Sequence, residues 1–485
     1  MAGSVEANAD SVVELASSFS NGPSRCGMRA GQARSANRAR IPNSVAGPPE
    51  SVFLLSVNRL YLSPGMFGFG RLATYDYFAH VERALVKRFA DAGKPLEAHV
   101  VDVSPTASIR RRAVRLAELV AKTADDGEGT IHLLGHSTGG LDARLVSSPS
   151  ARLPTAKENL AWLSRLRSVT TMSTPHYGTP LASFFATVSG QRMLYAVSAL
   201  TFIGLSLGAP PLAAASALVV AIGRLDRTLG VELRLLDRTT DALLRALEPA
   251  TSHEVRGYLD AIRRDQGAMI QLTPEAMDLF QAGVEDRPGV AYQCTCAQAP
   301  PPTPGGLARS LGGPWRAISS AIFTTMYGIT ARYDERYPCA APENGDVVDT
   351  ILVRAFGKLP GARANDGVVP VLSQVWGRVA WAGYADHLDV LGHFPGAVTP
   401  RPFLSSLFAR KSEVTAAYRR ASSPHRPVEV EVELEVEEAA VAGGVALDPV
   451  ADTRHVDWLR SGAGFDERSF AVLMDALAIG MLATC

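Results

Sequence analysis

The chain has 485 residues, of which 47% are hydrophobic and 20% are charged, so it is long and apolar enough to bury a large core. Its 48 basic residues balance 48 acidic ones, which leaves no electrostatic footprint for nucleic acid. The five cysteines are odd in number and scattered, which excludes both a complete disulfide framework and a cysteine metal site.

Residues 1–50 are rich in Ser, Ala, Asn, Gly and Arg and lack the uninterrupted apolar core of a secretory signal. We expect them to form a disordered lead. Localisation stays open between the cytoplasm and export by a route that leaves no recognisable signal in the sequence.

Residues 51–424 alternate between strand-like and helix-like patterns. Strands are expected at residues 51–62, 96–103, 130–134 and 167–172, and helices at residues 75–92 and 108–123, the second of them basic and amphipathic. Short strands that alternate with helices are typical of a parallel sheet covered on both sides. The sequence therefore predicts the α/β class, with a mostly parallel central sheet flanked by helices.

The strand rhythm stops between residues 191 and 264, where a long apolar and then amphipathic helical pattern predicts an insertion. Residues 193–223 carry no charge, but Gly-Ala-Pro-Pro at 208–211 divides them into halves that are short for a membrane span. We expect a helical lid or cap over an active site; a transmembrane helix and an ordinary pair of core helices are the alternatives. The sheet pattern resumes at residues 289–297, and a second insertion is expected at 299–349.

Residues 425–485 are expected to form a C-terminal appendage. Within them, residues 428–436 alternate Val or Leu with Glu at strand period. This pattern is typical of an exposed edge strand blunted by charge, and an edge that recruits a partner by strand addition is the alternative. We predict no stable protein partner.

One short motif carries a nucleophile. Residues 135–139 (GHSTG) follow the apolar strand pattern and precede a helical one, and they fit the G-x-S-x-G nucleophile elbow of the α/β-hydrolase fold. In that elbow a sharp strand-to-helix turn exposes the serine, and small flanking residues avoid a clash. Ser137 is therefore the expected nucleophile; a glycine-rich turn that merely contains a serine is the alternative.

A serine hydroxyl needs a base to take its proton and an acid to orient that base, and in this fold the chain order is Ser, then Asp or Glu, then His. His387 follows the apparent strand 378–381 on a polar loop and is the expected base, with His393 as runner-up. Asp366, on a turn between Ser137 and His387, is the expected acid. Weaker candidates for the acid are Asp346, Asp349 and Asp386.

The tetrahedral intermediate of ester cleavage also needs an oxyanion hole. In this fold one backbone N–H comes from the residue after the nucleophile and another from the loop after an early strand. Those residues are Thr138 and Met66, the latter in residues 64–68 (PGMFG), which we call the oxyanion loop. His136 and His176 lie too close to the elbow to leave room for the acid and are expected to shape the site.

Five blocks resemble the bacterial triacylglycerol lipases of the α/β-hydrolase superfamily, and they fall in that family's order. They are residues 64–68 (PGMFG), 135–140 (GHSTGG), 173–180 (STPHYGTP), 365–370 (NDGVVP) and 386–389 (DHLD). The resemblance covers about half the chain and implies Ser137 as nucleophile, Asp366 as acid, His387 as base, and Met66 with Thr138 as oxyanion donors. It also implies serine-dependent hydrolysis of carboxylic esters, with acylglycerols at an oil or membrane interface as substrates.

Two departures from the family pattern matter. The family often has His where this chain has Pro64, so the hydrogen bond that anchors the oxyanion loop must differ. Related lipases also hold a structural calcium through paired aspartates. Asp389 stands at one matching position and Asp346 is a candidate partner, but His393 stands where the family tends to offer an oxygen ligand. We therefore expect no cofactor, with calcium near Asp389 as the alternative.

Three rival functions remain open at this stage. An acyltransferase would use the same triad with an alcohol in place of water. A non-catalytic lipid-binding module on a decayed hydrolase scaffold would need no triad, although Ser, Asp and His candidates all stand in order. A membrane-anchored protein would need detergent for extraction.

Overall fold

The computed structural model describes most of the chain between residues 57 and 485. The described ranges are 57–66, 71–72, 75–104, 106–124, 129–207, 265–303, 314–343, 345–394 and 459–485, with single residues between 245 and 264. The expected disordered lead (1–50), most of the expected lid (191–264) and the alternating segment at 428–436 lie outside the described residues.

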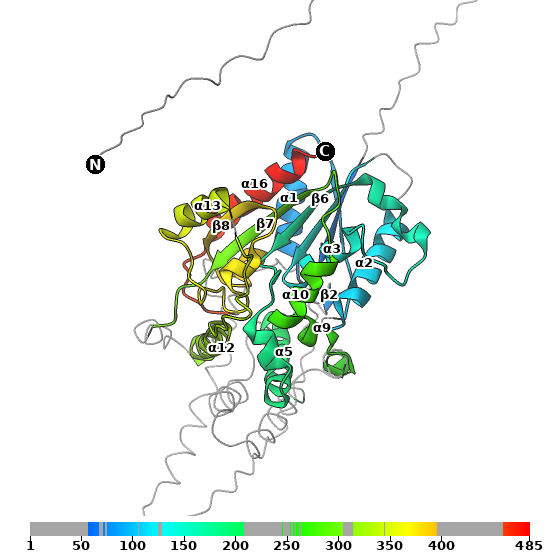
Figure 1. Cartoon of the computed structure of the whole chain (residues 1–485). Coiled ribbons are helices and arrows are strands. Elements are labelled where there is room, and N and C mark those ends of the chain that lie inside the picture. Colours follow the sequence, from blue (N-terminus) through cyan, green and yellow to red (C-terminus); the bar gives the residue numbers. More distant parts are fainter. Residues whose placement is uncertain are drawn as a thin grey trace, which may run out of the picture. The chain divides into compact units, whose positions relative to one another are not determined.

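A six-stranded parallel sheet forms the centre of the described molecule (Figure 1). Its spatial order is β4 (Leu96–Val100), β1 (Asn58–Ser63), β5 (Ile131–His136), β6 (Leu166–Met172), β7 (Ala291–Gln298) and β8 (Arg378–Tyr384). The chain runs from β1 to β4 on one side and then crosses to β5 on the other. Parallel sheets bind ligands at such a switch point, beyond the carboxyl ends of the strands.

Helices cover both faces of the sheet, because successive side chains of a strand point in opposite directions. On β1, Leu60 and Leu62 join the cluster that contains α1 (Ala79–Asp91), whereas Tyr61 joins the cluster that contains α2 (Ile109–Thr123) and α3 (Thr138–Ser147). Farther along the sheet, α13 (Asp346–Phe356) packs on β7 and β8. This strand order with helices on both faces is the α/β-hydrolase fold, so the predicted fold class is confirmed.

The helix α2 follows directly from its local sequence. Ser108 caps the first turn by accepting a hydrogen bond from the backbone N–H of Arg111 at 3.4 Å. Apolar residues then recur at helical spacing and are buried: Ile109, Ala113, Leu116, Ala117 and Val120. Arg112 lies on the same buried face, which is unusual for a charged side chain and matters for the site below.

The end of the chain belongs to the core of this fold. Residues 425–485 were expected to be an appendage, but α16 (Glu467–Leu482) packs on α1, β6 and β8. Its side chains Leu473, Met474, Leu477 and Met481 are fully buried in the cluster that also contains Leu60 and Leu62. Residues 459–485 therefore cover part of one face of the sheet. They do not belong to a separate appendage beginning at residue 425, because the apolar side of α16 is buried against the sheet.

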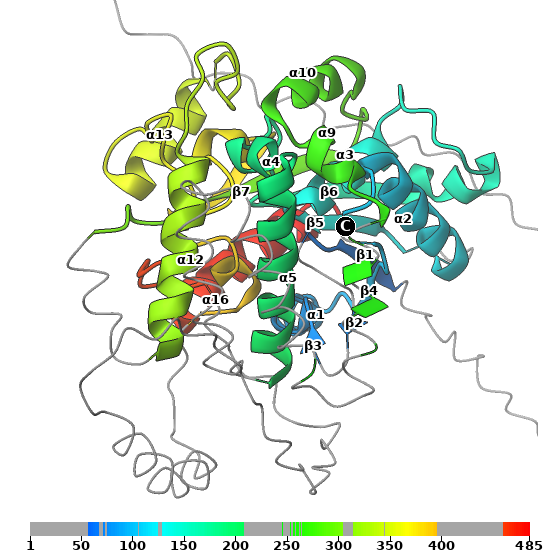
Figure 2. The ribbon, with the colours of Figure 1, turned by 90° about the horizontal axis from the view of Figure 1, so that it is seen from below.

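The segment after β6 forms α4 (Pro180–Phe185) and α5 (Val188–Leu207), and α12 (Pro314–Thr330) packs on α4 (Figure 2). In α5, Met193, Leu194 and Val197 are buried in the core. Within the described part of the chain, no helix combines the length and the apolar character that a membrane span requires.

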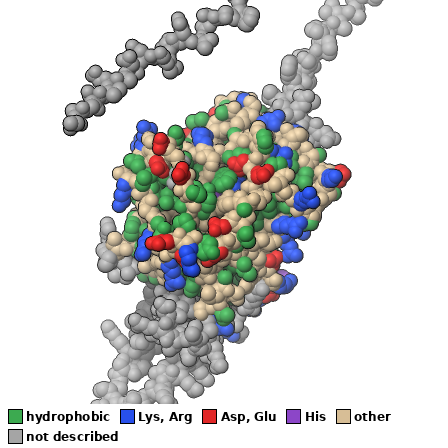
Figure 3. Space-filling model, viewed as in Figure 1, with side chains coloured by type: hydrophobic (Ala, Val, Ile, Leu, Met, Phe, Trp, Pro, Cys, Tyr) green, Lys and Arg blue, Asp and Glu red, His purple; other side chains and the backbone are tan. Residues whose placement is uncertain are grey.

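Short elements complete the description. They are the antiparallel pair β2 (Arg71–Leu72) and β3 (Tyr75–Asp76), the helices α9 (Gly267–Gln271) and α10 (Pro274–Gly283), and the 3-10 helices η1 (Lys157–Arg165), η2 (Val371–Gln374) and η3 (Asp389–Leu391). On the face drawn in Figure 3, acidic and basic side chains are interspersed, which fits the balanced net charge.

Candidate active site

The loop after β5 has the geometry of a nucleophile elbow. Ser137 has φ 54° and ψ −127° between the end of β5 and the start of α3, a conformation that non-glycine residues rarely adopt. Its backbone N–H donates to the Met172 carbonyl at 2.8 Å, which ties the turn to β6. A Cβ on Gly135 would lie 2.1 Å from the Gly139 backbone, and one on Gly139 would lie 2.0 Å from the Ser63 carbonyl oxygen. Only glycine fits at both positions, as the motif requires.

The structure brings Asp366 and His387 together. The His387 Nδ1 atom lies 2.8 Å from Asp366 Oδ2, and both side chains are almost fully buried. The backbone N–H of His387 also donates to the Asp366 carbonyl at 3.0 Å. The other carboxylate oxygen of Asp366 accepts the backbone N–H groups of Val368 and Val369 at 2.9 and 2.7 Å. An ionised carboxylate can only accept, so a neutral His387 carries its proton on Nδ1 and leaves Nε2 free as a base.

The elbow and the loop at residues 385–389, which we call the base loop, are in direct contact. The Nε2 atom of His136 lies 2.9 Å from the His387 carbonyl oxygen, and the two imidazole rings are 4.6 Å apart. The residue before the expected nucleophile therefore contacts the expected base. His136 therefore lies between the elbow and the base loop.

The weaker candidates lie in other surroundings. His393 is buried edge-on against His80, with ring centroids 5.8 Å apart. The Asp386 carboxylate accepts the backbone N–H groups of Leu388 and Asp389, both at 3.0 Å, within the base loop itself. Asp346 and Asp349 lie in the first turn of α13. None of these groups replaces the contact between Asp366 and His387.

A buried ion pair anchors the oxyanion loop. This ion pair was not identified from the sequence. Arg112 of α2 contacts Asp142 of α3 at 2.8 Å with both side chains fully buried, and it also donates to the Pro64 carbonyl. Asp142 accepts a further hydrogen bond from Ser63 Oγ at 2.7 Å. Burial raises the pKa of Asp142, and the adjacent Arg112 opposes that rise. This arrangement supplies the anchor that the expected departure at Pro64 requires.

The two expected oxyanion donors follow the ends of β1 and β5. Met66 is buried two residues after Pro64. Thr138 is the first residue of α3, where backbone N–H groups have no acceptor within the helix. Gly65 lies against the nucleophile, since a Cβ there would be 2.7 Å from Ser137 Cβ. The oxyanion loop and the elbow are therefore in contact at the carboxyl ends of β1 and β5.

His176, in the 173–180 block, takes part in a separate buried cluster. Its Nδ1 atom lies 3.2 Å from Arg144 Nη1, and its Nε2 atom lies 3.1 Å from Thr171 Oγ1. The Arg144 guanidinium lies 3.3 Å from the centre of the Trp376 ring. Burial and then the charge of Arg144 hold the pKa of His176 well below its usual value. An arginine only donates, so His176 accepts at Nδ1 and acts as a brace between α3 and β6.

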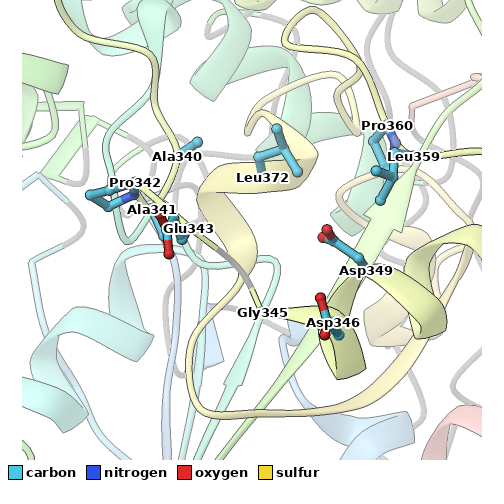
Figure 4. A pocket seen from close by; sticks show the side chains of 10 residues that line it. All are labelled: Ala340, Ala341, Pro342, Glu343, Gly345, Asp346, Asp349, Leu359, Pro360 and Leu372. Carbon is cyan, nitrogen blue, oxygen red and sulfur yellow. The ribbon is translucent and has the colours of Figure 1, made fainter. Parts of the chain in front are cut away.

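Asp389 and Asp346, the aspartates expected to hold calcium, have different surroundings. One oxygen of the Asp389 carboxylate accepts the backbone N–H of Asp386 at 2.8 Å. Asp346, the candidate partner, lines a cavity of about 480 Å³ with Asp349, Glu343 and Leu372 (Figure 4). Among the described residues, no group of three or more His, Cys, Asp or Glu side chains could hold a metal ion. The described side chains around Asp389 and Asp346 therefore do not fit a calcium ion.

One curated bacterial lipase and several solved structures are similar to parts of this chain. No profile of a known protein family matches the chain. A "Triacylglycerol lipase" of Vibrio cholerae serotype O1 is 31% identical over 150 residues, which are 31% of this chain and 41% of that protein. The chain thus matches about two fifths of the length of this curated relative.

Solved structures that are similar to this chain include EstA from Clostridium botulinum and the Staphylococcus hyicus lipase. The first has 19% identity, covers 70% of this chain and 83% of its own, and has a TM-score of 0.39. The second has 17% identity, covers 76% and 97%, and has a TM-score of 0.37. Over 150 residues the chain is similar to a bacterial triacylglycerol lipase, and its own sheet topology is that of an α/β-hydrolase.

Proposed function

We propose that the protein hydrolyses carboxylic esters through an acyl-enzyme on Ser137. The observation that carries the proposal is the buried pair of Asp366 and His387, linked through His136 to an elbow in which Ser137 has a strained conformation. A structural serine would not need two glycines without room for a Cβ beside it and an oriented imidazole in a loop that contacts its elbow.

The proposed reaction has two steps, acylation of Ser137 and deacylation, and the same catalytic groups act in both. Ser137 Oγ attacks the carbonyl carbon of the ester while His387 Nε2 takes the hydroxyl proton, and the backbone N–H groups of Met66 and Thr138 stabilise the oxyanion. Collapse of the intermediate breaks the bond to the alcohol, which leaves with the proton held by His387. Water then attacks the acyl carbonyl while His387 Nε2 takes its proton; collapse of this second intermediate breaks the bond to Ser137 Oγ, which recovers the proton as the acid leaves. Asp366 stays ionised and stabilises the imidazolium.

The proposed substrates are acylglycerols. The support is the similarity to a protein named triacylglycerol lipase and the uncharged segment at residues 193–223, whose beginning in α5 packs beside α4. Apolar side chains near a site of ester cleavage favour a substrate with a long acyl chain over a polar one. An uncharged lid would also favour substrate presented at a lipid surface.

The test compares the wild type with Ser137→Ala on p-nitrophenyl butyrate and p-nitrophenyl palmitate, together with labelling by a fluorophosphonate. Ser173→Ala is the matched control, because Ser173 is also buried with positive φ at the end of a neighbouring strand. We expect wild type and Ser173→Ala to hydrolyse and label, with the label on Ser137, and Ser137→Ala to do neither.

A folded wild type that neither hydrolyses nor labels would refute the serine mechanism and favour a lipid-binding module. The ratio of the palmitate rate to the butyrate rate tests the preference for long acyl chains. Product analysis with added glycerol distinguishes hydrolysis from acyl transfer. Free acid as the main product supports hydrolysis, and acylated glycerol as the main product supports an acyltransferase.

A further inference from the structure

A chain of hydrogen bonds links the oxyanion loop, the elbow and the base loop through two side chains outside the expected triad. The Gly65 backbone N–H donates to the Tyr77 hydroxyl oxygen at 3.3 Å. The same hydroxyl lies 2.6 Å from His136 Nδ1, and His136 Nε2 lies 2.9 Å from the His387 carbonyl oxygen. Tyr77 and His136 are 59 residues apart in the sequence, and His136 and His387 are 251 residues apart.

The direction of each hydrogen bond follows from the chemistry of the groups. A carbonyl oxygen only accepts, so His136 must carry a proton on Nε2. Burial, with a smaller contribution from the neighbouring His387, holds the pKa of His136 well below its usual value, so the ring is neutral and Nδ1 accepts from Tyr77. The tyrosine hydroxyl accepts from Gly65 and donates to His136. The link is uncharged and has a single orientation.

This link gives His387 its third point of attachment. Asp366 holds the Nδ1 atom and the backbone N–H of His387, and His136 holds the carbonyl oxygen. At the other end, the Tyr77 ring is buried and packs edge-on against Phe78, with centroids 4.9 Å apart. The residue that precedes Met66 is therefore tied to the backbone of the expected base through two rigid rings.

We infer that Tyr77 and His136 are positioning residues that set the distance between the oxyanion loop and the base loop. The inference rests on the proposed ester hydrolysis. Neither side chain takes a proton from substrate: their role is to hold the oxyanion loop and the base loop at a fixed separation around the elbow. Orientation of this kind acts on the chemical step more than on substrate binding, because a misplacement near 1 Å can cost about a hundredfold in rate.

The first experiment compares Tyr77→Phe with Tyr61→Phe. Tyr61 is a matched control, since it is fully buried in β1 and its hydroxyl makes one hydrogen bond, to Thr123 Oγ1 at 2.9 Å, away from the site. With p-nitrophenyl butyrate we expect Tyr77→Phe to lower kcat about tenfold with KM within about twofold of wild type. Labelling by a fluorophosphonate should slow by the same factor, and the pH midpoint of kcat/KM should stay in place. Tyr61→Phe should match wild type in all three readouts.

The second experiment separates the two ends of the link. A glutamine amide nitrogen reaches the position of His136 Nε2, whereas an asparagine side chain reaches only the position of Nδ1. His136→Gln keeps a donor for the His387 carbonyl, and His136→Asn keeps a partner for Tyr77. We expect His136→Gln to retain a kcat several times that of His136→Asn at equal thermal stability. This comparison also serves if Tyr77→Phe does not fold.

The outcomes distinguish this inference from the proposed function. If wild type is active and Ser137→Ala is not, but Tyr77→Phe behaves like Tyr61→Phe, the positioning role is wrong and ester hydrolysis stands. An activity order with His136→Asn above His136→Gln would equally overturn it. If the wild type does not label at all, ester hydrolysis itself is wrong, and the two tyrosine variants then differ only in stability.

Discussion

Replacing Gly65 by alanine places a methyl group between the oxyanion loop and the nucleophile. A Cβ at this position would lie 2.7 Å from Ser137 Cβ, 3.0 Å from the Tyr77 hydroxyl and 3.3 Å from His136 Nδ1. The first distance is far inside the usual carbon–carbon contact of about 3.5–4.0 Å. Both Ser137 and Tyr77 are held by the surrounding fold, so the oxyanion loop is the part that must move.

The expected displacement of the loop is about 1 Å, the difference between the two distances. A displacement of this size takes the Met66 N–H away from the developing oxyanion. Loss of one oxyanion donor costs about 10²–10³ in kcat, and a 1 Å misplacement about 10². We therefore expect Gly65→Ala to lower kcat about a hundredfold. Overpacking should also lower the free energy of unfolding by about 1–3 kcal/mol.

The assay measures kcat and KM for p-nitrophenyl butyrate and the fluorophosphonate labelling rate, with urea unfolding as a check on the fold. Gly361→Ala is the matched control, because a Cβ on this loop glycine meets no atom within 4 Å. It should leave both rates unchanged. If Gly65→Ala stays within threefold of the wild type in kcat while folded, the oxyanion loop does not pack against Ser137 as the structure has it, and the assignment of Met66 fails.

Three further predictions concern stability and are measured by urea unfolding. Arg112→Met leaves Asp142 buried without its cation and should lower the free energy of unfolding by about 3–5 kcal/mol. The double variant Arg112→Met with Asp142→Leu should recover at least half of that loss. Equal losses in the single and the double variant would contradict the pairing. Burial lowers the pKa of His132 to about 4. As the pH falls below about 6.5, His132 therefore binds a proton in the unfolded chain but not in the folded chain. Wild type should therefore lose about 2 kcal/mol from this group between pH 7.5 and 5, and His132→Gln should show a correspondingly flatter pH dependence. Leu473→Ala on the buried face of α16 should cost about 2–5 kcal/mol and Val472→Ala on its exposed face under about 0.5; similar values would mean that α16 does not pack on the sheet.

Local sequence patterns determined the secondary structure around the site. A strand at residues 130–134 and a helix after the elbow were predicted because an apolar run, a glycine-rich turn and a helical pattern follow one another; the structure has Ile131–His136 and Thr138–Ser147. The order Ser137, Asp366, His387 followed from the motif and from the chain order of the fold. These predictions needed only the conformational preferences of neighbouring residues and knowledge of the motif.

Only the tertiary structure identified Arg112, Asp142 and Tyr77 as residues that contact the candidate site. Arg112 lies on the apolar stripe of α2, and this charged residue among Ile109, Ala113 and Leu116 is a signal that could have marked it. Its acceptor at Pro64 is 48 residues away, however, and no local pattern encodes that partner.

The placement of the last helix was likewise decided by the fold. The apolar residues of α16 are visible in the sequence, but which surface they cover depends on α1 and β8, which lie far along the chain. Propensity and periodicity are set by adjacent residues, whereas burial and hydrogen-bond partners are set by packing between distant segments. The sequence by itself therefore determined the elements and the reactive motif, and the packing of those elements decided which other side chains hold the motif in place.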